Sequence, residues 1–196
     1  MHSAWVTAKG EKMSKSLGNG LSVPAVLTQN SAWVVRYALG SVQYRSMLEW
    51  SDQTLAEAQS AYDRVSNFIE RAGAAVGEQP SREEIVSISA DDLPADFVAA
   101  LNDDINVSGA SAAIFTAIRF GNTLLSKLAD RVDSDIAKGE VRTVLVNVRA
   151  MLDTLGLDPL AEPWVSEGAA GGTAGAGADS AEHTALVGLV SEHLDE

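Results

Sequence analysis

The feature of the sequence that most limits its fold is a run of apolar side chains at helical spacing within residues 51–76. Residues three and four apart lie on one face of a helix, so this run gives one long helix an apolar stripe. The stripe consists of Leu55, Ala58, Tyr62, Val65, Phe68, Ile69 and Ala72. Ser51 or Asp52 suits the N-cap of this helix, and Gly73 or Gly77 suits its end. The pattern predicts a mainly α fold.

Shorter patterns precede this segment. Residues 3–9 suit a strand or an extended stretch of chain. Pro24 fits the first turn of a short helix that stops near residues 29–30. Apolar side chains at helical spacing predict a further helix at about 31–45, for which Ser31 is a suitable N-cap.

A second helical block is expected after a polar segment. Residues 77–94 are polar and contain proline, so we expect a loop there. Pro94 fits the start of the next helix, and the run "NDDIN" at 102–106 interrupts its pattern. Ser108 opens another helix, and the last helix of the block stops at Gly156, because glycine readily adopts the left-handed conformation.

The composition changes after residue 164. Residues 165–182 are rich in Gly and Ala, which is typical of a flexible linker. Residues 183–196 have an amphipathic pattern whose apolar face consists of Leu186, Leu189, Val190 and Leu194. We expect this segment to begin a further, C-terminal helical region that is truncated here.

Composition argues against several classes of protein and site. The 196 residues include no cysteine, which excludes disulfides and thiolate metal sites. The three histidines, His2, His183 and His193, lie near the ends and lack the spacing of metal ligands, so no metal site is expected. No apolar run approaches the roughly 20 residues of a membrane span, and the N-terminus has no secretory stretch. We therefore expect a cytoplasmic protein with no membrane partner.

The formal net charge of −13 is unevenly distributed. Residues 1–50 contain five Lys and Arg against two acidic residues, a net +3, whereas residues 51–196 contain nine against 25, a net −16. A polyanion would prefer the first part and be repelled by the second. An acidic surface that only keeps a helical domain soluble is the alternative interpretation.

The motif whose side chains most indicate a functional site is the run "GEKMSKSLGN" at residues 10–19. Lys12 and Lys15 are compact cations suited to phosphate oxygens, and Ser14 and Ser16 add hydroxyl donors. The flanking glycines allow a backbone to approach an anion closely. From this chemistry alone, the run is either a phosphate-binding loop or a solvated surface loop.

The spelling "KMSKS" at 12–16 is identical to the second signature of class I aminoacyl-tRNA synthetases, and "GEKMSKSLGN" resembles the cysteinyl-tRNA synthetase family most. The segment "VVRYALGSVQYRSMLEWSDQTLAEA" is similar to the "LRYFLLS" and "HYRS" stretch of that family. "FVAALNDDINVSGASAAIF" resembles its "F…AMDDDFNTPEALA…LF" helical region, often called the DALR domain. The resemblance covers about 1–155 and suggests the C-terminal part of such a protein, beginning just before the KMSKS loop.

The resemblance implies a cysteine–tRNA ligase activity for the full-length protein. The family activates cysteine with ATP, as Mg-ATP, to cysteinyl-adenylate and pyrophosphate, and transfers the cysteinyl group to its specific tRNA. By resemblance, Lys15 is the ATP-binding lysine and Lys12 assists it, while Ser14 and Ser16 hold the loop and Met13 packs it down. ATP, cysteine and tRNA are the implied partners, and a monomer is expected.

The same resemblance implies that part of the machinery lies outside this sequence. The other class I signature, a histidine pair, is absent from the chain. The zinc ligands of the family also belong to an upstream segment, so zinc is expected only there, and His2 is not proposed as a ligand. The isolated chain is therefore expected to be inactive.

The implied domain organisation has five parts, all read from the resemblance and the patterns above. The fold class is mainly α: the end of a class I Rossmann-type catalytic domain, followed by a helical stem-contact region and a DALR-type helical bundle. The boundaries are 1–30 for the catalytic end with the KMSKS loop, 31–80 for the stem-contact region, 92–160 for the DALR-type domain, 165–182 for the linker and 183–196 for the start of an anticodon-side helix.

Two other functions fit the sequence. A cysteine ligase that acts on an amino sugar in thiol biosynthesis shares the activation chemistry and the lysine loop. The second alternative is a non-catalytic helical module that binds an anion or a partner through the loop.

Two further groups of residues have side chains that could form a site. Tyr44, Arg45 and Trp50 could contact a nucleotide, but we favour packing of the aromatic residues and an intramolecular ion pair of Arg45. Asp103 and Asp104 could be an acid/base pair, but adjacent positions do not share a helix face, and a helix-end role is favoured.

Overall fold

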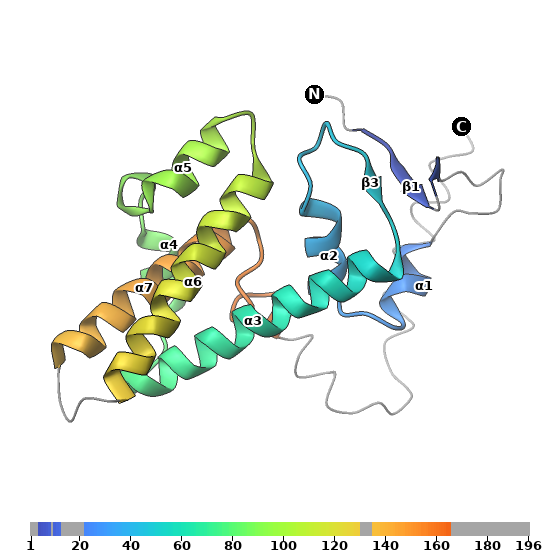
Figure 1. Cartoon of the computed structure of the whole chain (residues 1–196). Helices are drawn as coiled ribbons and strands as arrows, with labels where there is room; N and C mark the ends of the chain where they lie inside the picture. The colour runs from blue at the N-terminus through green and yellow to red at the C-terminus, as the bar shows by residue number, and fades with distance from the viewer. Residues whose placement is uncertain (1–3, 9, 13–21, 130–134, 166–196) are drawn as a thin grey trace. The chain divides into compact units, whose positions relative to one another are not determined.

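The computed structural model describes residues 4–8, 10–12, 22–129 and 135–165 (Figure 1). The chain divides into two compact units, Met1–Trp164 and Val165–Glu196. The predicted helix at 183–196 and all of the predicted linker except Val165 lie outside the described residues.

A small sheet is formed close to the N-terminus from β1 (Val6–Ala8), β2 (Glu11–Lys12) and β3 (Leu48–Glu49), in the order β2-β1-β3. Strand β1 pairs antiparallel with β2 and parallel with β3. The turn between β1 and β2 contains Gly10 at φ +77°, a conformation that glycine adopts without steric cost. The extended stretch predicted at 3–9 is confirmed by β1, whereas β3 was not predicted.

Helix α1 (Val23–Leu27) and helix α2 (Ala32–Gly40) follow, and each is capped by the serine that precedes it. The prediction of a helix at 31–45 is wrong at its C-terminal end. Glycine has a low helix propensity, so α2 ends at Gly40. The residues after it turn toward the sheet, where the Ala4 N–H donates to the Tyr44 carbonyl at 2.8 Å.

Helix α3 (Asp52–Val76) confirms the helix predicted from the apolar stripe. The Ser51 hydroxyl accepts a hydrogen bond from the Thr54 N–H at 3.2 Å, which caps the helix. At the other end, Gly77 adopts φ +97° and its N–H donates to the Gly73 carbonyl.

The segment predicted as a loop at 77–94 instead contains helix α4 (Arg82–Ser87) and a 3-10 helix, η2 (Ala90–Asp92). The Ser81 hydroxyl caps α4 by accepting from the Glu84 N–H at 3.2 Å. Acidic residues in the first turn favour a helix because they offset its N-terminal partial charge. The loop prediction therefore missed a local capping signal.

Three helices form the second block: α5 (Ala95–Asn102), α6 (Val107–Ala129) and α7 (Asp135–Thr154). The predicted interruption between α5 and α6 is confirmed, because Asp104 and Ile105 adopt φ values of +53° and +54°.

Helix α7 packs against α3, α4 and α6, and α5 packs against α6. Large, fully buried side chains of the main core include Trp33, Phe68, Phe97, Leu145 and Met151. The fold is mainly helical, as predicted. Because residues from 31–80 and from 92–160 share this core, both ranges lie in one compact unit.

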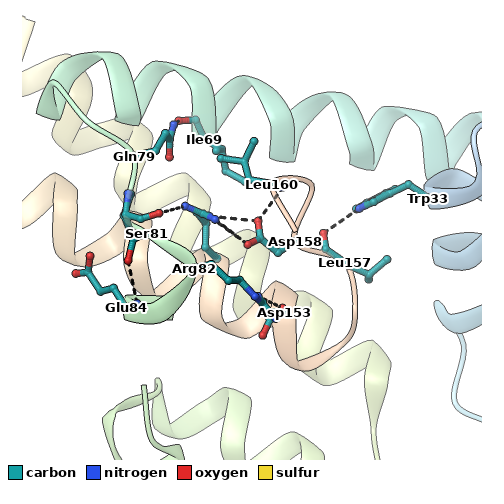
Figure 2. Close-up of polar contacts among 12 residues, drawn as sticks. Trp33, Ile69, Gln79, Ser81, Arg82, Glu84, Asp153, Leu157, Asp158 and Leu160 are labelled. Carbon is teal, nitrogen blue, oxygen red and sulfur yellow. Dashed lines mark hydrogen bonds and ion pairs between the residues drawn. The ribbon is translucent and has the colours of Figure 1, made fainter. Parts of the chain in front are cut away.

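Polar contacts fix the chain that follows α7 (Figure 2). The Trp33 indole N–H donates to the Leu157 carbonyl at 2.8 Å, which joins α2 to this segment. Arg149 and Asp158 form an ion pair, and they are only 2% and 1% exposed. The Arg149 guanidinium also donates to the Pro80 carbonyl, so the pair connects α7 to the segment before α4.

Candidate functional site

The five residues predicted to bind ATP start at the end of the β1–β2 hairpin. Lys12 is the second residue of β2, and its Cα pairs with that of Thr7 in β1. The other four, Met13, Ser14, Lys15 and Ser16, lie outside the described residues. The structure therefore gives the base of the lysine loop, and the roles of the five side chains stay predictions.

Glu49 connects this hairpin to the next strand. The Thr7 hydroxyl donates to Glu49 Oε2 at 2.5 Å, and the Gly10 N–H donates to Glu49 Oε1 at 3.2 Å. One carboxylate thus bonds both to β1 and to the turn that leads into the lysine loop. Hydrogen bonds to a charged acceptor are stronger than neutral ones. Glu49 was not predicted as a site residue.

The same strand joins the hairpin to α3. The Trp50 N–H donates to the Thr7 carbonyl at 2.7 Å. The Thr54 hydroxyl, in the first turn of α3, donates to the Glu49 carbonyl at 2.8 Å. The base of the lysine loop and the start of the longest helix are therefore joined through residues 48–50. No local signal in the sequence indicates this connection, because Thr7 and Glu49 are 42 positions apart.

A second polar cluster lies between the α2–β3 connection and the turn before α6. The Tyr44 hydroxyl donates to Asp104 Oδ1 at 2.7 Å, and Arg45 forms an ion pair with the same carboxylate at 3.3 Å. The hydrogen bond from Arg45 Nε to the Tyr44 oxygen, followed by the charge of Asp104, raises the pKa of the Arg45 guanidinium. The ion pair expected for Arg45 is confirmed.

This cluster also accounts for Asp104. Its carboxylate accepts from Tyr44, from Arg45 and from the Gln43 amide at 3.2 Å. These bonds hold a residue at positive φ, a conformation that asparagine and aspartate tolerate better than most residues. Asp103 is the C-cap of α5. The pair thus has the helix-end role that the sequence favoured.

The two tryptophans near the N-terminus differ in burial. Trp33 is 2% exposed and stacks on Tyr37, with ring centroids 5.3 Å apart, so it packs in the core. Trp5 is 57% exposed. Trp50, for which the sequence favours packing, is half-buried against the core.

The residues that the structure describes contain no group of three or more His, Asp or Glu side chains placed to hold a metal ion. Among the helices described here, none combines the length and the apolar character needed to cross a bilayer.

Comparison with protein families gives one match. Residues 1–60 match the family described as tRNA synthetases class I (C) catalytic domain. The matched range contains the hairpin, Glu49, and the start of α3.

Three relatives carry the same name. A cysteine–tRNA ligase of Bifidobacterium longum is 77% identical over 195 residues, which are 100% of this chain and 35% of that protein. Those of Beutenbergia cavernae and Streptomyces avermitilis are 48% and 42% identical, over 87% and 86% of this chain and over 34% and 33% of the relatives. The chain thus spans about a third of the length of these relatives.

These findings confirm the resemblance to the cysteinyl-tRNA synthetase family. They do not support the narrower prediction that the chain is the C-terminal part of such a protein, because the match to the family is to its catalytic domain, at residues 1–60. Over its whole length the chain is similar to cysteine–tRNA ligases, and its first 60 residues match the class I (C) tRNA synthetase catalytic domain.

Proposed function

We propose that the chain is part of a cysteine–tRNA ligase and contributes the KMSKS loop to its active site. The observation that carries this proposal is the 77% identity over the whole chain to a protein of that name. The full-length protein would activate cysteine with ATP and transfer the cysteinyl group to its tRNA. The KMSKS spelling and the position of the loop on a catalytic-domain segment support the same conclusion.

The two lysines of the loop would act in the first step of the reaction. In the first step, a cysteine carboxylate oxygen attacks the α-phosphorus of ATP, and pyrophosphate leaves with the electron pair of the broken P–O bond. Negative charge builds up on the phosphate oxygens in the transition state. Lys15 and Lys12 would stabilise that charge, and Ser14 and Ser16 would donate hydrogen bonds to oxygens or to the loop itself. Met13 would pack the loop without taking part in the chemistry.

In the second step, a terminal hydroxyl of the tRNA attacks the carbonyl carbon of cysteinyl-adenylate, and AMP leaves. This chain would hold the loop in place for the first step. The contacts of Glu49 with Thr7 and Gly10 support that role, because they connect the base of the loop to β3, the strand next to α3.

The finer organisation is also part of this proposal. Residues 1–30 would complete the catalytic domain, 31–80 would contact the acceptor-stem side of the tRNA, and 92–160 would be the DALR-type bundle. A protein that charges tRNA would act in the cytoplasm, and we propose a monomer that uses Mg-ATP. The 196 residues alone would be inactive, because they lack the first class I signature and span about a third of the relatives.

A charging assay tests the proposal. It uses a protein of the relatives' length that contains this chain, with Lys15→Ala as the variant and Lys138→Ala, an exposed lysine on α7, as the control. Loss of one donor to a developing oxyanion typically lowers kcat by about 10²–10³. We expect that loss in ATP–pyrophosphate exchange and in tRNA charging for Lys15→Ala only.

Three other results would contradict the proposal. Cysteine-dependent exchange with transfer to an amino sugar, and no charging of tRNA, would favour the thiol-biosynthesis ligase. The absence of any exchange by the parent protein would favour a non-catalytic binding module. Equal activity of Lys15→Ala and the parent would remove the lysine from the mechanism.

A further inference from the structure

A groove between α3 and α6 contains three arginines in a chain whose net charge is −13. Arg64 and Arg71 lie on α3 and Arg119 lies on α6, and all three are exposed. They line a hollow of about 230 Å³ together with Asn67, Phe68, Phe115, Ile118 and Asn122. We refer to these residues as the arginine groove.

The three arginines differ from most other arginines that the structure describes. Arg45, Arg82, Arg142 and Arg149 each form an ion pair with a carboxylate. The contacts of the groove arginines are neutral. Arg64 Nε donates to the Ser60 carbonyl at 3.3 Å, Arg71 Nη1 to Asn122 Oδ1 at 3.2 Å, and Arg119 Nη2 to Thr116 Oγ1 at 2.8 Å.

Each guanidinium therefore keeps most of its hydrogen-bonding capacity. A guanidinium has about five N–H donors, and each of the three groove arginines uses one in the contacts above. Guanidinium groups match the oxygens of a phosphate in a bidentate arrangement, and they are less strongly hydrated than an ammonium group. The unused donors are thus suited to phosphate oxygens.

The local charge also favours an anion. Helix α6 contains no Asp or Glu between Val107 and Ala129. On α3, Asp63 and Glu70 come one position before the two arginines, and so they lie about 100° around the helix from them. The groove is a basic strip on an acidic protein, and the excess of acid elsewhere would repel a polyanion from other faces.

Packing holds the strip in place. Gly121 allows the close approach of the two helices, since a Cβ at this position would be 2.4 Å from the Phe68 ring. The Arg64 guanidinium carbon lies 4.6 Å from the centroid of the Phe115 ring, a cation–π distance. Arg64 and Arg71 are seven residues apart, which is about 10.5 Å along α3.

From these observations we propose that the arginine groove binds the phosphate backbone of RNA. The choice of RNA as the source of the phosphates rests on the proposed function, in which tRNA is the substrate. The strip would make contacts with the backbone that are independent of base sequence. It is separate from the lysine loop in sequence, and no comparison assigns a role to it.

Salt dependence of binding measures such contacts. The probe is unfractionated, deacylated tRNA, and the measurement is the Kd of the 196-residue chain between 50 and 300 mM KCl. Each phosphate contact adds about 0.9 to the slope of log Kd against log[salt]. At 0.1 M salt, the loss of one contact therefore weakens binding by roughly eightfold. We expect R71Q/R119Q to lower the slope by about 1.8 and to weaken binding about 60-fold at 0.1 M.

The matched control is R82Q/R142Q, which changes the formal charge by the same amount on arginines outside the groove. We expect it to bind tRNA nearly as well as the parent. Far-ultraviolet circular dichroism tests whether each variant is folded. The single variant R119Q is a second check on folding, because the only hydrogen bond named above for Arg119 is the one to Thr116 on the same helix.

Several outcomes would overturn the inference. Equal losses of tRNA affinity in the two double variants would indicate an effect of net charge alone. An unchanged salt slope in R71Q/R119Q would show that these arginines make no phosphate contacts. The third such outcome is no binding of tRNA by the parent chain at 50 mM KCl. Inorganic phosphate that competes with tRNA at micromolar concentration would instead indicate a site for a free anion. None of these outcomes changes the result of the charging assay with Lys15→Ala, so failure of the groove and failure of the proposed function are distinguishable.

Discussion

Replacement of Asp158 by asparagine should strongly destabilise the chain. The Asp158 carboxylate accepts from Arg149 Nε at 3.2 Å and from Arg149 Nη2 at 3.0 Å, and it accepts from the Leu160 N–H at 3.2 Å. Asparagine has nearly the same size, so the packing would hardly change. It is neutral, however, and its amide nitrogen would direct donors at the donors of Arg149.

The magnitude follows from the burial of the pair. Arg149 is 2% exposed and would keep its charge with only neutral oxygens, such as the Pro80 carbonyl, as acceptors. Removing one partner of a buried pair costs about 3–5 kcal/mol, because the other charge remains buried and uncompensated. A domain of ordinary stability has about 5–15 kcal/mol in total. The variant should therefore lose a large share of its stability, and its Tm should fall by roughly 6–20 °C.

Urea unfolding followed by circular dichroism at 222 nm measures the effect. We expect a lower midpoint with an unchanged m-value, since the surface exposed on unfolding is the same. Asp153→Asn is the matched control. Its ion pair with Arg82 is partly exposed, with side chains 24% and 46% accessible, and exposed pairs contribute about 0–1 kcal/mol.

The double variant R149M/D158L separates the lost charge from lost packing. It removes both charges and should recover part of the stability that Asp158→Asn loses, because apolar replacements of a buried pair are often tolerated. The reasoning fails if Asp158→Asn stays within about 1 kcal/mol of the parent chain, or if it costs no more than Asp153→Asn.

Three further predictions concern other parts of the unit. Gly121→Ala should lose about 1–3 kcal/mol in urea unfolding, because its Cβ would meet the Phe68 ring at 2.4 Å, and a cost below 0.5 kcal/mol would show that α3 and α6 can separate freely. Glu49→Ala should speed amide exchange at Gly10 by roughly fivefold or more, because the hydrogen bond from this N–H is lost, and an unchanged rate would contradict the contact. Burial raises the pKa of the Tyr37 hydroxyl, and this effect is larger than the opposing effects of the Arg64 charge and of a hydrogen bond with Ser111. The unfolded chain then releases this proton first, so the free energy of unfolding should fall as pH rises above about 10, and Tyr37→Phe should reduce that fall.

The secondary structure was predictable wherever its signal is local. The N-caps Ser31 and Ser51, the stop at Gly77 and the break at 102–106 are properties of a few adjacent residues, and each is found where the sequence indicates it. The apolar stripe of α3 is also local, because its period alone selects a helix face. Even the missed helix α4 had such a signal, a serine followed three residues later by a glutamate.

The elements that were missed depend on distant residues. Strand β3 has two residues and exists through its pairing with β1, more than 40 positions away. Without that pairing, the helical spacing of the apolar residues after Ser31 led to a prediction that ran past Gly40. Of the candidate site, only the backbone of Lys12 is described, so the chemical roles in the lysine loop still rest on the resemblance.

The sequence by itself determined the mainly helical fold, most helix ends, and the lysine loop with its family resemblance. Those features follow from spacing and capping over a few residues. Only the tertiary structure decided that Glu49 joins the loop base to β3, that Arg149 and Asp158 pair in the core, and that three arginines of α3 and α6 face one groove. The physical reason is that side-chain partners far apart in sequence are chosen by packing, which no local pattern of residue types specifies.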